Sequence, residues 1–332
     1  PFVLQLFQSA TIISYYHIII VKRGIKMENL LDILSPQERT VLSFRALFES
    51  KGYRRIKANR FEEYRFYLEN INFLRSEQLI TFSDLDGRLK ALKPDVTLSI
   101  VKHYGSNGGL NKLYYIENVY RPGPTGRSFA EISQMGLECI GKVGKAEVSE
   151  VLYLSYESLK LTGKPFRLSV SHVGFIAGLM KSLKVPTQYR GALYESIASK
   201  NPLGLRMTAE AAGLSGENID FLQKAALLSG GADKVIDTAF KYCKNSEMHR
   251  AVGQIKDAID GLDSSNILID FSIRGDEDYY SGLMFCGYIK GRSRVVLSGG
   301  QYDNMLKKMN KEGRAIGFAL YLSELFGGER HA

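Results

Sequence analysis

Cysteine is scarce in this chain of 332 residues, which contains only Cys139, Cys243 and Cys286. The three thiols lie far apart and form no CxxC pair, so the sequence supports neither a disulfide scaffold nor a zinc knuckle. Cysteine used in this way is typical of a reducing compartment, and we expect a cytoplasmic protein.

Catalytic and metal-binding signatures are equally scarce. The sequence contains no HExxH, GxSxG or GxGxxG motif. His103, His172 and His249 stand alone on predicted helices, without a second ligand at metal spacing, which favours surface or structural histidines. We therefore expect no metal and no cofactor.

Long runs of Lys or Arg are missing as well, although basic residues outnumber acidic ones by 44 to 35 and the net charge is +9. Lys22, Arg23 and Lys26 fall in a first stretch without acids, so residues 27–332 carry only +6. A modest excess spread among acids predicts a solvated surface of mixed sign in preference to a stripe that binds nucleic acid. Apolar residues at 45% and charged residues at 24% are typical of a globular protein with a buried core.

The first stretch of the chain differs in character from the rest. Residues 2–21 are largely apolar and are followed by VKRGIK, which resembles a marginal transmembrane helix or anchor. Polar side chains interrupt the run, and the basic residues follow it, unlike in a secretory signal. We favour Met27 as the true start, with residues 1–26 a doubtful extension. A membrane anchor and an ordinary extension stay open as alternatives, and we expect no membrane partner.

From Met27 onward, helix and strand signals alternate. Ser35-Pro36-Gln37-Glu38 predicts a capping box at the start of a helix, and Asp86-Gly87 predicts the turn of a β-hairpin. Alternating apolar residues predict strands over 113–123 and 131–141. Strands and helices mixed in this order indicate an antiparallel α+β core.

Residues 186–264 contain only helical patterns. Strand signals resume at 267–273, and a helix is predicted near 315–326. The sequence thus predicts an α+β fold in which an antiparallel sheet is flanked by helices and interrupted by an all-helical insertion. The core would comprise residues 27–185 and 265–332, with the insertion over 186–264.

One predicted strand carries polar groups on a single face. Alternation along 131–138 places Gln134, Gly136 and Glu138 together. An amide, a missing side chain and a carboxylate suit a shallow pocket better than a packed core. A face exposed to solvent remains the alternative. Two further Tyr/Asp clusters flanked by glycine, at 276–282 and 299–303, favour a small-molecule site.

Five segments in order resemble the catalytic core of class II histidyl-tRNA synthetases. They are LKPDVTLSIVKHYG (92–105), VYRPGPTGRSFAEISQMGLECIG (119–141), DYYSGLMF (278–285), SGGQYDNML (298–306) and AIGFALYL (315–322). The first resembles the "LRPEGT" segment that holds the amino acid's α-amino group in that family, and the second resembles motif two. The resemblance spans about residues 27–332 and implies a class II synthetase-like fold.

The chain departs from that family on the ATP side. Glu324 stands where motif three has the arginine that grips ATP, and a reversed charge opposite a triphosphate does not support adenylation. The catalytic arginine that precedes the tyrosine pair is displaced to Arg274. The chain ends at Ala332, soon after motif three, so we expect no anticodon-binding domain and no tRNA partner.

The amino-acid side of the family's pocket is kept. Seven positions match that pocket and are predicted to bind histidine: Asp95, Thr97, Arg121, Gln134, Glu138, Tyr280 and Tyr302. We predict no catalytic residue. By the resemblance, Asp95 would pair with the α-ammonium group, Arg121 and Gln134 would serve the carboxylate, and Glu138 with the tyrosines would read the imidazole ring.

A lost ATP site beside a kept amino-acid site resembles the regulatory subunits of ATP phosphoribosyltransferase. That resemblance implies a non-enzymatic, allosteric subunit that partners the short-form catalytic subunit in the first step of histidine biosynthesis. It also implies self-association as a dimer and L-histidine as a feedback effector. The alternatives are another histidyl-tRNA synthetase paralogue or a truncated synthetase that binds histidine.

Overall fold

The computed structural model describes residues 33–74, 78–105, 109–123, 126–273 and 279–327. The preferred start at Met27 and the doubtful extension before it lie outside these ranges. The chain divides into two compact units, residues 1–47 and 48–332. The boundaries predicted for the core and the insertion stay a prediction.

The predicted capping box is confirmed in the first unit. Helix α3 (Pro36–Ser50) begins there, the Ser35 backbone N–H donates to Glu38 Oε2 at 2.7 Å, and the Glu38 N–H donates to Ser35 Oγ at 3.2 Å. Two N–H groups that the helix cannot satisfy itself are thereby paired.

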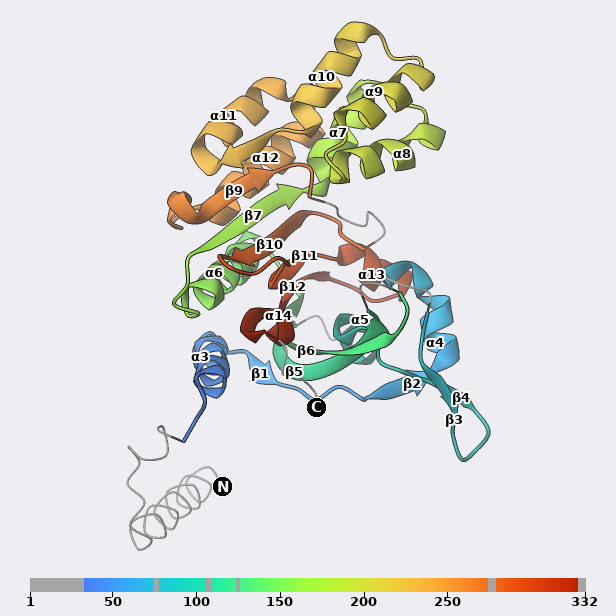
Figure 1. Cartoon of the computed structure of the whole chain (residues 1–332), viewed down its shortest axis with the longest axis vertical. Coiled ribbons are helices and arrows are strands. Elements are labelled where there is room, and N and C mark those ends of the chain that lie inside the picture. Colours follow the sequence, from blue (N-terminus) through green and yellow to red (C-terminus); the bar gives the residue numbers. More distant parts are fainter. Residues whose placement is uncertain (1–32, 75–77, 106–108, 124–125, 274–278, 328–332) are drawn as a thin grey trace, which may run out of the picture. The chain divides into compact units, whose positions relative to one another are not determined.

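The second unit is built on a nine-stranded sheet (Figure 1). Its strands, in spatial order, are β1 (Arg54–Arg55), β5 (Leu110–Pro122), β6 (Phe129–Gly141), β12 (Arg314–Tyr321), β11 (Leu297–Gln301), β10 (Leu283–Ile289), β7 (Phe166–His172), β9 (Ile267–Asp270) and β8 (Ser229–Gly231). Neighbours run antiparallel, as predicted, except for the parallel pairs β1–β5 and β7–β9 near the two edges.

The helix predicted near 315–326 is wrong over most of its length. Residues 314–321 form β12, which pairs with β6 on one side and β11 on the other, and only Leu322–Phe326 is helical (α14). A central strand covered on both faces reads as a continuous apolar run, because neither face must be polar. Periodicity alone does not separate such a run from a buried helix.

A smaller sheet of three strands lies just before Asp95 and Thr97 in the chain. Its strands, in spatial order, are β2 (Phe61–Glu63), β4 (Leu89–Leu92) and β3 (Thr81–Ser83). Its β3–β4 turn falls at Asp86-Gly87, as predicted, with Gly87 at φ +80°. Helix α4 (Tyr64–Glu69) and a 3₁₀ turn at Ile71–Phe73 lie between β2 and β3 in the chain.

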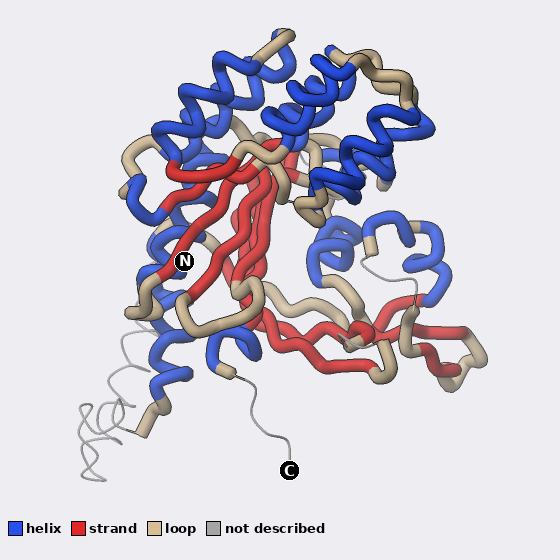
Figure 2. Tube along the Cα trace, turned by 45° about the horizontal axis from the view of Figure 1, so that its top comes forward, coloured by secondary structure: helices blue, strands red, loops and turns tan. Residues whose placement is uncertain are grey.

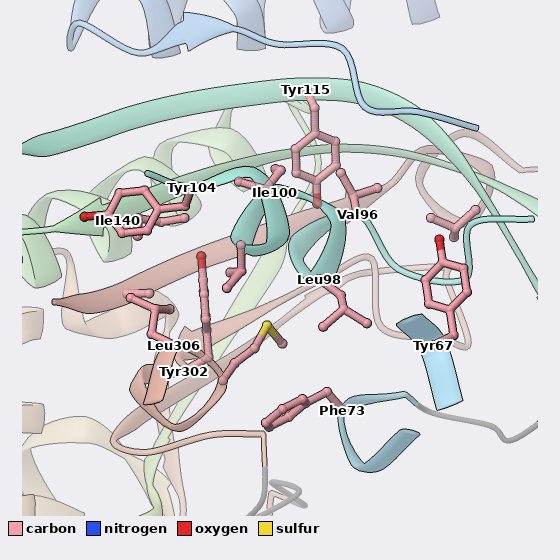
Figure 3. Packing of buried hydrophobic residues seen from close by; sticks show 14 of the residues in the cluster. Tyr67, Phe73, Val96, Leu98, Ile100, Tyr104, Tyr115, Ile140, Tyr302 and Leu306 are labelled. Atoms are coloured by element: carbon pink, nitrogen blue, oxygen red, sulfur yellow. The ribbon is translucent and has the colours of Figure 1, made fainter. Parts of the chain in front are cut away.

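Helix α5 (Val96–His103) follows β4 and is buried along most of its length. Figure 3 shows the cluster on and around this helix, including Ile100, Tyr115 and Tyr302. Tyr302 precedes the short helix α13 (Asp303–Lys308). The cluster fixes α5 against β5 and α13, three of the elements that contribute to the candidate site.

Helix α6 (Lys145–Lys160) packs against the strands β12, β10 and β7 of the large sheet. The other helices lie together beyond the β7–β9 end of that sheet (Figures 1 and 2). They are α7 (Val173–Ser182), α8 (Thr187–Ala198), α9 (Pro202–Ala211), α10 (Gly216–Ala226), α11 (Ala232–Tyr242) and α12 (Ser246–Ile259). Residues 186–264 are helical as predicted, apart from a short 3₁₀ turn at Ser264–Asn266 and the three-residue strand β8, which pairs with β9. Ser-Gly-Gly offers no alternating pattern from which a strand could be predicted. Among the described residues, no helix is both long and apolar enough to cross a bilayer.

His172 was predicted to lie on a helix, but it is the last residue of β7 and the N-cap of α7. Its Nδ1 accepts the Gly174 N–H at 3.0 Å, and its Nε2 lies 2.6 Å from Gln254 Oε1. The ring is buried between sheet and helices, where its role is structural.

Candidate amino-acid site

One cavity of about 480 Å³ is lined by all seven residues that the sequence singled out. Asp95 and Thr97 come from the start of α5, Arg121 from β5, and Gln134 and Glu138 from β6. Tyr280 precedes β10, and Tyr302 precedes α13. Segments separated by more than 200 residues thus converge on a single pocket, with a volume within the range of small-molecule sites.

An ion pair marks one wall of the cavity. Asp95 Oδ2 lies 3.1 Å from Arg121 Nη2, and Arg121 Nε donates to the Pro94 carbonyl at 2.5 Å. Asp95 is also the N-cap of α5, accepting the Leu98 N–H at 2.8 Å through Oδ1. Each carboxylate oxygen has two acceptor sites, and the guanidinium has five N–H donors. Both groups therefore keep hydrogen-bonding capacity for a ligand bearing an ammonium and a carboxylate.

A second carboxyl group, Glu138, is 1% exposed. Its Oε1 accepts from Thr97 Oγ1 at 2.6 Å, and its Oε2 accepts from the Tyr302 hydroxyl. Burial raises the pKa of Glu138 to about 8, an effect that these two hydrogen bonds oppose and the nearby Asp95 charge supports. At neutral pH Glu138 is thus favoured in its protonated form, which can donate to or accept from a ring nitrogen.

Gln134 lies on the same face of β6 as Glu138, as alternation predicted, and is buried at 3% exposure. Its side chain lines the cavity. A buried amide is normally paired, because leaving it unpaired costs about 1–3 kcal/mol. Facing the cavity, Gln134 is suited to bind a polar ligand group.

Two glycines make room for these side chains. A Cβ at Gly317 on β12 would collide with the Glu138 carboxylate, and one at Gly300 on β11 would meet the Tyr280 ring at 2.7 Å. Both positions are therefore restricted to glycine by close approach and not by backbone conformation.

The cavity also contains aromatic residues that the predicted set left out. Tyr279 packs edge to face with Tyr280 at 4.8 Å between ring centroids, lies 6.1 Å from Tyr302, and contacts Phe73 at 6.4 Å. Tyr115, on β5, is paired in register with Gly136. A large ring opposite a missing side chain is the signal that could have identified Tyr115, but it requires the strand register.

The cavity is also lined by Cys286, Val295, Ser298 and Tyr321, with Ser298 Oγ 2.6 Å from the Tyr321 hydroxyl. Glu324 on α14 forms an ion pair with Arg294 at 2.9 Å. The displaced Arg274 falls outside the described residues. Among those described, no group of three or more His, Cys, Asp or Glu side chains could hold a metal ion.

Comparisons with known proteins agree with this architecture. The family profile described as histidyl-tRNA synthetase matches residues 32–325. The ATP phosphoribosyltransferase regulatory subunit of Caldanaerobacter subterraneus subsp. tengcongensis is 30% identical over 288 residues, covering 83% of this chain and 74% of the relative.

Two solved structures show the same fold. An ATP phosphoribosyltransferase regulatory subunit/histidyl-tRNA synthetase from Bacillus halodurans has a TM-score of 0.77 at 24% identity, covering 87% of this chain and 78% of that one. An ATP phosphoribosyl transferase (HisG:HisZ) complex from Thermotoga maritima contains a chain with a TM-score of 0.67 at 20% identity, covering 86% of this chain and 97% of that one. The predicted class II synthetase-like fold is thereby confirmed. With the family match and the 30% identical relative, it follows that this chain belongs to the histidyl-tRNA synthetase family and, within it, to the ATP phosphoribosyltransferase regulatory subunits.

Proposed function

We propose that this chain is the non-catalytic subunit that the short-form catalytic subunit of ATP phosphoribosyltransferase requires for activity, and that it transmits feedback inhibition by L-histidine. The observation that carries the proposal is the single cavity that joins the Asp95–Arg121 pair to Glu138. The Thermotoga maritima complex, in which a chain of this fold is named together with a partner, supports the assignment of the partner.

The chemistry of the cavity matches each part of histidine. The carboxylate of Asp95 suits the α-ammonium group, while the free donors of Arg121 and the amide of Gln134 suit the α-carboxylate. Glu138 and the hydroxyl of Tyr302 suit the imidazole, whose two nitrogens require a donor and an acceptor. Tyr280 forms an aromatic wall for the flat ring.

Inhibition would work through linkage. Histidine shifts the subunit between two conformations only by the difference in its affinity for them, typically about 1–3 kcal/mol in allosteric proteins. Linkage is reciprocal. The factor by which histidine changes the affinity of this subunit for the catalytic subunit should therefore equal the factor by which the catalytic subunit changes the affinity for histidine. We also propose that the subunit self-associates as a dimer.

The first test is reconstitution with the short-form catalytic subunit. We expect a complex on size-exclusion chromatography that turns over ATP with phosphoribosyl pyrophosphate, and turnover that falls when histidine is added. Failure to form any complex would defeat the proposal. ATP–pyrophosphate exchange that depends on histidine would instead favour a truncated synthetase, a reaction that the Glu324–Arg294 pair does not favour.

The second test locates the histidine site. Glu138→Gln keeps the shape of the side chain but removes the titratable proton that the carboxyl group would share with the imidazole, and we expect at least about a tenfold loss of histidine affinity by calorimetry. Glu131→Gln is the matched control, because Glu131 lies on the same strand but is exposed and bonds to Asn118 and Tyr120. Equal affinities for both variants would place histidine elsewhere, for example at a subunit interface.

A further inference from the structure

Lys93 is fully buried, at 0% exposure, two residues before Asp95. Its ammonium lies 2.8 Å from Glu117 Oε2, and the Glu117 side chain is 11% exposed. Burying an ammonium is costly, and a buried ion pair is weak evidence for stability, because apolar residues of the same volume often do as well. The pair therefore calls for an account beyond stability.

The pair joins three segments of the chain. Glu117 Oε1 accepts the Ala58 N–H at 3.1 Å, while Glu117 Oε2 binds Lys93. The backbone of Lys93 is also fixed, because its N–H donates to the Arg60 carbonyl and its carbonyl accepts the Tyr120 N–H, both at 2.9 Å. Lys93 is thus held between the β1–β2 connection and strand β5.

The same strand holds the residues that follow. Glu117 and Arg121 lie four residues apart on one face of β5, and Arg121 binds both the Pro94 carbonyl and the Asp95 carboxylate. Residues 93–95 therefore run along β5 with an ion pair at each end, Lys93–Glu117 and Arg121–Asp95. Only the second of these pairs lines the cavity.

We infer that Lys93 is a positioning residue for the amino-acid site: its ion pair with Glu117 fixes the segment that presents the Asp95 carboxylate to the α-ammonium group of the ligand. The inference rests on the proposed histidine site and specifies what orients its ammonium-binding wall. A carboxylate held in place before binding loses less conformational entropy when the ligand arrives.

The test compares two ligands, histidine and imidazolepropionate, which keeps the ring and the carboxylate but lacks the α-amino group. The variant is Lys93→Met with Glu117→Gln, because methionine alone would leave a buried carboxylate unpaired, whereas glutamine can still accept the Ala58 N–H. We expect histidine affinity to fall at least about tenfold and imidazolepropionate affinity to change less than about twofold. Lys93→Arg, which keeps the charge, should restore most of the histidine affinity.

The control is Lys90→Met. Lys90 lies on the neighbouring strand β4 and pairs with Asp84 at 3.3 Å, and it does not line the cavity. We expect neither ligand to bind differently. If the double variant loses affinity equally for both ligands, Lys93 merely supports the fold. If its histidine affinity is unchanged, Lys93 does not position Asp95. Either result overturns the inference.

A readout without ligand separates this inference from the proposed function. Asp95 caps the Leu98 N–H, so a displaced carboxylate should speed hydrogen exchange at Leu98 in the double variant relative to wild type. If wild-type protein binds no histidine, the proposed function fails on its own, and the role of Lys93 is decided by this exchange rate. Unchanged protection at Leu98 would overturn that role.

Discussion

Two buried titratable side chains on the same sheet, Glu138 on β6 and His172 on β7, have opposite relations to their surroundings. Glu138 faces a cavity of about 480 Å³ and uses one hydrogen bond for each oxygen, so acceptor sites remain. His172 uses both ring nitrogens, with Gly174 and Gln254, and faces a cavity of about 40 Å³, room for about one water molecule. Both side chains are buried, so burial does not distinguish them. What identifies the β6 end of the sheet as the binding side is a side chain that faces a cavity and still has hydrogen-bonding capacity for a ligand.

The pKa shifts show why burial alone is a poor marker. Loss of solvation raises the pKa of Glu138 to about 8 and lowers the pKa of His172 to about 4, because each neutral form is favoured. For Glu138 the folded state binds the extra proton, so the free energy of unfolding falls as pH rises from 4.5 to about 8. For His172 the unfolded state binds the extra proton, so stability is lost as pH falls from 6.5 to about 4.

The largest expected effect is a loss of stability when His172, the structural member of this pair, is replaced. His172→Leu leaves the Gly174 N–H and the Gln254 amide without their partner and removes the cap of α7. We expect the free energy of unfolding to fall by about 2 kcal/mol, measured by urea denaturation at pH 7.5. Histidine affinity of the folded fraction should stay unchanged.

The matched control is His249→Leu, because His249 is exposed on α12, where its ring contacts Phe240. We expect its stability to change by less than about 0.5 kcal/mol. If His172→Leu instead weakened histidine binding and spared stability, the division between a structural and a ligand-binding group would be wrong.

If histidine binds beside Glu138, its affinity should depend on pH, because the carboxyl group and the imidazole ring would share one proton. Between about 6.5, the pKa of a free imidazole, and about 8, the pKa of Glu138, carboxyl and ring already carry the one proton that they would share. Above that window binding must take up a proton, and below it binding must release one. Histidine affinity should therefore be greatest from about pH 6.5 to 8 and fall by up to about tenfold per unit on either side.

Calorimetry in buffers of different ionisation enthalpy measures this proton exchange directly. Glu138→Gln should abolish the share of proton uptake that belongs to the carboxyl group, leaving at high pH only the effect of the ligand's own α-ammonium. An identical alkaline decline in wild type and Glu138→Gln would show that Glu138 does not titrate with the ligand.

The sequence predicted much of this binding side, because its residues occur in ordered segments of recognisable type. Asp95 and Thr97 follow a proline at a helix start, and Gln134 and Glu138 alternate along one strand, so local rules place them. Which strand neighbours which is a non-local property. The opposition of Tyr115 to Gly136 and the buried Lys93–Glu117 pair could therefore not be read from spacing.

The errors have the same origin. β12 was predicted to be helical because residues on both of its faces are buried, which removes the polar face that distinguishes a strand. His172 was placed on a helix because a cap residue belongs to neither element by pattern, and its partner Gln254 lies 82 residues away. Tertiary contacts decide both cases.

The variant with the smallest expected effect tests whether helix α12 can be altered without changing ligand binding in the cavity. Gly253 lies inside α12, and a Cβ there would meet no heavy atom within 4 Å. Alanine restricts the unfolded chain and suits a helix interior, so Gly253→Ala should raise the free energy of unfolding by about 0.5–1 kcal/mol. Urea denaturation measures the gain, and calorimetry should find histidine affinity unchanged, because nothing that lines the cavity is altered. A change in affinity would mean that α12 differs between the conformations that histidine selects, and the two sides of the sheet would then act as one switch.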